Sequence, residues 1–335
     1  MKQRNNSIDA VKGIAIVLVM IGHVFVHNHM EDAYVYDFIK AVQMPLFMII
    51  SGYLCGQGRK IPDVKTYGKV MGKRAVSYLV PFFAWLTIMH LTNLGEAYRT
   101  IVFQLDYGLW FLAVLFILTF MAYTAQLAAE KVRNETIFWI VYGMFCMILV
   151  LQIVIGNTFL SPYLTIIYVP FYMLGYVIEN YGKKFLCWDT KESGKIDCKN
   201  NRVIQAVVAA MAFAFLYLVI ARNLNSMETK LDSIIQMAAS VLGSIAIIYA
   251  ALWWKEGKIK NIFAKIGNCT LEIYVIHYHF ANMLNFNDKQ YDFYTLEGFF
   301  FVIASFVAMS AVTFCTIWLM KKVKLLDLLF FGKKP

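Results

Sequence analysis

Long runs of apolar residues, separated by short polar segments, make up most of this chain. Ten of the runs come close to the ~20 residues that an α-helix needs to cross a bilayer. The pattern therefore predicts an all-α polytopic membrane bundle of about ten transmembrane helices, forming one domain over residues 1–335. The predicted spans are 9–27, 37–55, 75–94, 108–129, 136–155, 162–179, 203–221, 233–254, 266–285 and 297–320.

Composition supports a membrane protein. Hydrophobic residues make up 60% of the 335 residues and charged residues only 16%, against ~25% charged in an average soluble protein. The predicted ninth span is the most polar, since it contains Asn268, Glu272, His277, His279 and Asn282.

The distribution of basic residues predicts the orientation. With the N-terminus in the cytoplasm, 25 of the 31 Lys and Arg residues fall in inner segments and four in outer segments. This bias follows the positive-inside rule, which places both termini in the cytoplasm. The net charge of +10 is then explained by topology, and we expect no nucleic-acid partner.

Two longer inner segments stand out, at 59–74 and 180–202. In the first, apolar and basic residues alternate at helical spacing, which predicts an amphipathic helix on the inner membrane face. Two interpretations remain open: attraction to anionic lipid headgroups, or binding of an anionic cytoplasmic ligand. The apolar residues are Val64, Tyr67, Val70 and Met71, and the basic ones are Lys65, Lys69 and Lys73.

The first span contains two polar side chains that a membrane helix normally lacks, Lys12 and His23. Lys12 lies near the inner end, from which its ammonium group can reach the headgroups. Eleven residues are close to three helical turns, so both side chains lie on one face, ~16 Å apart along the axis. This geometry suits an elongated donor such as coenzyme A, with its anionic end at Lys12. His23, with an ordinary pKa of ~6.5, is a natural general base.

The stretch "IDAVKGIAIVLVMIGHV" (8–24) resembles the opening of the acyltransferase-3 family, whose members acylate bacterial surface glycans. Further blocks resemble the family in the expected order, and the closest likeness is to the branch related to fucose 4-O-acetylases. They are "MPLFMIISGYL" (44–54), "KRAVSYLVPFF" (73–83), "LWFLAVLF" (109–116), "FYMLGYVIE" (171–179) and "IGNCTLEIYVIHYHF" (266–280).

The resemblance implies that His23 is the catalytic histidine, and that Lys12 and Arg74 bind acetyl-CoA as the acyl donor. Two positions depart from the family pattern. Lys12 stands where relatives usually have Arg, which keeps the charge but loses the bidentate fork. The second motif, two arginines three apart, has only Arg74 here, with Lys73 or Lys69 as candidate replacements.

The acceptor side offers further candidates. His277 aligns with the end of the family's last block, and Glu272 lies seven residues before His279 on one predicted helix face. Each has an alternative explanation in helix packing or in ordinary solvation. Trp110 is interpreted either as an interfacial anchor or as a platform for a sugar ring. The predicted substrate-binding residues are His277, Glu272, Trp110, Asp106 and Asp37.

These features predict a membrane O-acetyltransferase of the bacterial cytoplasmic membrane. It would move an acetyl group from cytoplasmic acetyl-CoA directly to a hydroxyl of a cell-surface or lipid-linked glycan. No Cys/His cluster has metal-ligand spacing, so no metal is predicted. The alternative is a transporter or flippase for a small molecule or lipid-linked sugar that uses Lys12 and His23 as binding or proton-relay residues.

Overall fold

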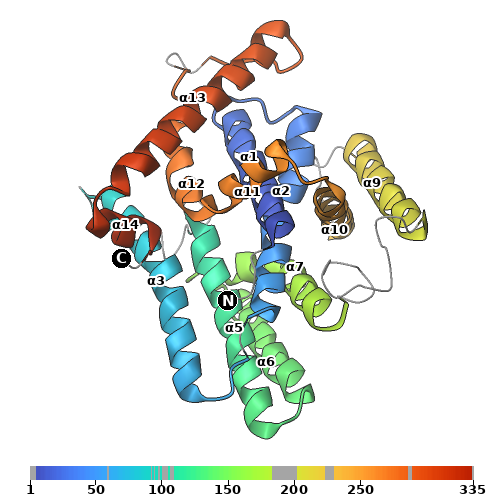
Figure 1. Ribbon diagram of the computed structural model, residues 1–335, viewed down its shortest axis with the longest axis vertical. Helices are drawn as coiled ribbons and strands as arrows, with labels where there is room; N and C mark the ends of the chain where they lie inside the picture. Colours follow the sequence, from blue (N-terminus) through green and yellow to red (C-terminus); the bar gives the residue numbers. More distant parts are fainter. Residues whose placement is uncertain are drawn as a thin grey trace. The chain divides into compact units, whose positions relative to one another are not determined.

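A computed structural model describes residues 5–58, 60–91, 93, 95–96, 99, 105, 109–182, 202–222, 230–285 and 289–333. Every regular element in these ranges is a helix, which confirms the all-α prediction (Figure 1). The chain forms two compact units, one of residues 1–50 and 181–318, the other of residues 51–180 and 319–335. The predicted single domain stays a prediction.

The first unit contains α1 (Asn6–Val26) and most of α2 (Tyr34–Gly56). Asn5 caps α1, because its side-chain oxygen accepts hydrogen bonds from the backbone N–H groups of Ser7 and Ile8. The later elements are α9 (Arg202–Arg222), α10 (Lys230–Trp253), α11 (Lys258–Gly267), α12 (Thr270–Ile276), the 3₁₀ helix η4 (His277–Phe280) and most of α13 (Leu296–Met320).

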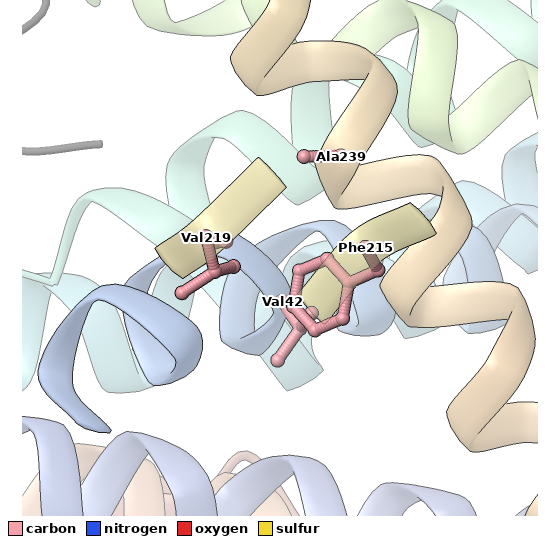
Figure 2. Packing of buried hydrophobic residues seen from close by; sticks show 5 residues of the cluster. Val42, Phe215, Val219 and Ala239 are labelled. Atoms are coloured by element: carbon pink, nitrogen blue, oxygen red, sulfur yellow. The ribbon is translucent and has the colours of Figure 1, made fainter. Parts of the chain in front are cut away.

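Buried apolar side chains hold α2, α9 and α10 together in this unit. Val42 of α2 faces Phe215 and Val219 of α9, and Ala239 of α10 lies against the same group (Figure 2). Ala41 belongs to the same cluster. α1 in turn packs against α10 and α11.

The second unit is built on α3 (Val64–Met89). In it α3 packs on α5 (Trp110–Val132), α5 on α6 (Thr136–Val154), and α6 on α7 (Pro162–Val177), which continues as the π-helical turn η2 (Ile178–Gly182). The short C-terminal helix α14 (Lys324–Phe331) lies against α3 (Figure 1).

Seven of the described helices are long and apolar enough to cross a membrane: α1, α2, α5, α6, α9, α10 and α13. Each coincides with a predicted span, so the protein is a multi-pass membrane protein. The predicted span 75–94 belongs to α3, which also takes up most of the amphipathic segment 59–74 in one continuous helix. Span 162–179 corresponds to α7 and the start of η2.

The predicted ninth span is wrong as a single helix. Residues 266–285 are divided between the end of α11, the seven residues of α12 and the four of η4. The break falls at Gly267 and Asn268, two residue types with poor helix propensity, and the backbone of Gly267 packs closely on that of Asp9. The chain therefore turns at this point.

Candidate active site

Lys12 and His23 lie on the single uninterrupted helix α1, as the spacing requires. Ile16 and Val19, which lie between them on the same face, are fully buried, whereas Lys12 and His23 keep partial exposure. This face of α1 is therefore turned towards the interior of the first unit.

Near the N-terminal end of α1, Lys12 has a partner on its own helix. Its Nζ lies 2.9 Å from Oδ1 of Asp9, one turn earlier, and both side chains are mostly buried. The carboxylate of Asp9 also suits the positive end of the helix dipole. An anionic ligand at Lys12 would meet an ammonium group that is already ion-paired.

At the other end, aromatic rings surround His23. Its ring centroid lies 5.1 Å from that of His277, 5.2 Å from Tyr278 and 5.8 Å from His27. Tyr278 stands edge-on to both His23 and His27. His277 and Tyr278, more than 250 positions later in the sequence, thus share one site with α1.

His277 is held in a defined orientation. Its Nδ1 donates a hydrogen bond of 2.8 Å to the backbone carbonyl of Ile273. The neutral ring therefore presents an acceptor lone pair at Nε2, which is buried and has no hydrogen-bond partner among the described residues. A buried nitrogen of this kind, near His23, is available to a bound hydroxyl or to a protonated His23.

Close backbone contact between α1 and α11 brings His277 to this place. A side chain at Gly13 would overlap the carbonyl of Phe263, and one at Gly267 would overlap the carbonyl of Asp9. Small residues at such crossings let membrane helices approach each other. η4 begins at His277, only ten residues after Gly267, where this crossing ends.

Asn28 connects the C-terminal end of α1 to the segment that carries His277. Its buried Nδ2 donates to the carbonyls of Val24 (2.7 Å) and Ala281 (3.2 Å), so it links the end of α1 to the residue after η4. No sequence pattern singled out Asn28 or Tyr278. Both residues follow a candidate histidine by one or a few positions. Polar residues this close in sequence to a candidate histidine are the pattern by which they could have been found.

The remaining acceptor candidates differ in burial and position. Glu272 and Asp37 are buried in the first unit, on α12 and α2. His279 is exposed, so the predicted face shared by Glu272 and His279 is wrong, because α12 gives way to a 3₁₀ helix at His277. Asp106 lies outside the described residues, as do 183–201 of the predicted inner loop.

The second unit holds Arg74 and Trp110. The Arg74 guanidinium donates a hydrogen bond of 3.2 Å to the Tyr78 hydroxyl and lies beside Tyr123 and the buried thiol of Cys55. Trp110 stacks on Tyr168, with ring centroids 5.2 Å apart, so one face of its ring is already covered.

Lys69 and Lys73 do not share the environment of Arg74. Both lysines are exposed on α3, whereas Arg74 is partly buried, and five residues of helix place Lys69 ~140° round from Arg74. The structure therefore does not bring the two lysines to Arg74 as replacements for the missing second arginine.

The sequence profile of the acyltransferase domain family matches residues 5–321. The chain belongs to the acyltransferase-3 family. This acyltransferase is thus an enzyme that moves an acyl group from a donor, and the family model covers both α1 and the His277 segment. In the described part of the acyltransferase, no group of three or more His, Cys, Asp or Glu side chains is arranged to hold a metal ion.

Two curated relatives carry the name nodulation protein NolL. The acyltransferase is 31% identical over 102 residues to NolL of Sinorhizobium fredii and 36% identical over 92 residues to NolL of Mesorhizobium japonicum. These matches cover 29% and 26% of the acyltransferase, and 27% and 24% of the relatives, so only about a quarter of each relative's length is matched. No solved structure matches the acyltransferase significantly.

Proposed function

We propose that this acyltransferase transfers the acetyl group of cytoplasmic acetyl-CoA to a hydroxyl of a cell-surface or lipid-linked glycan. The observation that carries the proposal is the arrangement on α1: Lys12 near the inner end and His23 on the same buried face, surrounded by His277, His27 and Tyr278. Family membership favours this enzyme over the transporter or flippase.

In the proposed reaction His23 acts as general base. It takes the proton of the acceptor hydroxyl while the oxygen attacks the thioester carbonyl carbon. The C–S bond then breaks, and the sulfur leaves as thiolate and recovers the proton from His23. The products are the acetyl ester and free CoA, and His23 returns to its neutral form.

His277 is proposed as the group that receives the acceptor. Its Nε2, fixed by the bond from Nδ1 to the Ile273 carbonyl, accepts a hydrogen bond either from the sugar hydroxyl or from protonated His23. We place the buried acids Glu272 and Asp37 on the acceptor side and Lys12 and Arg74 on the donor side, as the family resemblance implies.

The proposal includes the orientation. We expect ten crossings in the bacterial cytoplasmic membrane with both termini in the cytoplasm, because 25 basic residues then lie on the inner side. In this orientation Lys12 faces the cytoplasmic donor, and His23 lies in the outer half of the membrane.

The test is label transfer in liposomes that contain the purified protein, acetyl-CoA labelled in the acetyl group and a crude glycan extract. We expect His23→Ala to reduce both CoA release and glycan labelling by at least ~100-fold, the usual contribution of a general base. His279→Ala, which removes an exposed histidine from η4, is the matched control and should stay near native activity. Equal activity of the native chain and His23→Ala refutes the assignment.

A further inference from the structure

An apolar groove runs along α3 in the second unit, where α14 forms its second wall. The cavity has a volume of ≈ 550 Å³, within the ~300–1,000 Å³ range of ligand pockets. Its only polar side chain, Thr87, donates its hydroxyl hydrogen bond to the Phe83 carbonyl of its own helix. The lining residues are Ala75, Val76, Leu79, Val80, Phe83, Ala84, Thr87, Leu329 and Phe330.

Two specific contacts hold α14 against α3 and so define the groove. Trp85 Nε1 donates to the Phe330 carbonyl at 3.3 Å, and the two rings meet at 5.1 Å. Two residues later, directly after the C-terminal end of α14, Gly332 packs on the backbone of Val76 and Ser77, about nine residues before Trp85 on α3. These contacts leave the space between the helices open.

A line of lysines continues the floor of the groove. Val76, Val80, Phe83 and Thr87 follow one another by three or four residues, and the same spacing backwards from Val76 reaches Lys73 and Lys69. Both lysines are exposed, and among the described residues neither ammonium group forms an ion pair. The exposed Lys333, next to Gly332, adds a cation from the other wall at the same end.

The dimensions fit one leaflet of a membrane. The lining positions on α3 extend from residue 75 to residue 87, ~18 Å of helix, against ~15 Å for half of a bilayer's hydrocarbon core. The charged end lies towards the start of α3, which the positive-inside bias places in the cytoplasm. A phospholipid of the inner leaflet would lay a chain in the groove and its phosphate among the lysines.

We propose that the α3–α14 groove binds an anionic phospholipid, with one acyl chain between the helices and the headgroup on Lys69, Lys73 and Lys333. The site goes beyond acetyl transfer, does not depend on it, and gives the two lysines a role separate from Arg74. Each lysine near an anionic lipid headgroup should raise the preference for that headgroup over a neutral one by about five-fold. Removing two lysines should therefore lower the headgroup preference by about 25-fold.

The experiment counts lipids retained on the full-length protein by native mass spectrometry. The protein is taken from nanodiscs that contain phosphatidylglycerol and phosphatidylcholine with identical acyl chains. We expect the native chain to retain phosphatidylglycerol preferentially, the Lys69→Gln/Lys73→Gln variant to lose that preference, and Ala84→Leu or Val80→Trp to lose the lipid with either headgroup. Lys131→Gln/Arg133→Gln removes two exposed inner charges elsewhere and should retain the native preference.

Three results would overturn the proposal. In the first, the Lys69/Lys73 variant keeps the native preference, or the Lys131/Arg133 control loses as much of it. In the second, a polyprenyl phosphate displaces phosphatidylglycerol from the native chain. In the third, the lipid count is unchanged while the KM for acetyl-CoA rises, which would return the lysines to the donor site.

Discussion

The close crossing of α1 and α11 makes Gly13 the most informative position to change. In Gly13→Ala the new methyl group would overlap the backbone carbonyl of Phe263, and backbone atoms cannot move aside as the end of a flexible side chain can. The two helices must separate by on the order of 1 Å, because the interior is close-packed. Such overpacking costs about 1–3 kcal/mol, and the better helix propensity of alanine returns up to about 1 kcal/mol of this.

The larger effect should be on catalysis. The segment that follows α11 carries His277, whose ring lies 5.1 Å from that of His23. A displacement of about 1 Å at a reacting centre lowers a rate by about 100-fold, equal to about 2.7 kcal/mol in the barrier. We therefore expect Gly13→Ala to be produced as a folded protein with slightly reduced thermal stability and a kcat about 100-fold lower.

The assay is single-turnover acetyl transfer at saturating acetyl-CoA, with thermal unfolding in detergent measured on the same samples. Gly143→Ala is the matched control, since a side chain at Gly143 on α6 meets nothing within 4 Å. Full activity of Gly13→Ala would refute the argument that backbone contact positions His277. Equal loss in both variants would attribute the effect to glycine replacement in general.

Three further predictions concern the same unit. His277→Gln, which keeps a hydrogen-bonding side chain of similar size, should lower kcat by about 10-fold and flatten its pH profile; an unaltered profile contradicts the role of Nε2. Asn28→Ala breaks two buried hydrogen bonds and should cost about 1–3 kcal/mol of stability, measured by thermal unfolding. Glu256 accepts hydrogen bonds from Lys260 (2.7 Å) and Asn6 (2.8 Å), and the bond from Lys260 holds the pKa of this carboxyl below its usual range. The ionised Glu256 therefore stabilises the fold above ~pH 4.3, the usual pKa of an unfolded glutamate. This stabilisation is lost as the pH falls through the lower pKa that Glu256 has in the folded protein. Acidification should therefore lower the thermal stability of the native chain more than that of Glu256→Gln.

The features that sequence could predict are those that depend on one helix. Lys12 and His23 share a face because α1 is regular, and that regularity follows from the ten consecutive apolar or glycine residues between them, 13–22. The helical spacing of apolar and basic residues at the start of α3 was predicted from the sequence in the same way. Periodicity cannot, however, separate Lys69 from Arg74 by environment, because this depends on Tyr78, Tyr123 and Cys55.

Features that depend on contacts between distant segments were out of reach. The turn after Gly267 follows from the packing of α11 on the backbone of α1, and hydropathy averaged over twenty residues hides such a break. The same holds for Asn28, whose second partner lies at Ala281. The candidate residues could be chosen from their side-chain chemistry. The residues that surround them in space could be identified only from the fold.

The hydrogen bond that orients His277 has a consequence for how this site tolerates mutation over time. Its acceptor is the main-chain carbonyl of residue 273, which every amino acid carries. The hydrogen bond itself therefore does not depend on which side chain stands at position 273. Relatives that keep the histidine but carry a different residue four positions earlier can therefore retain the same orientation of the imidazole ring.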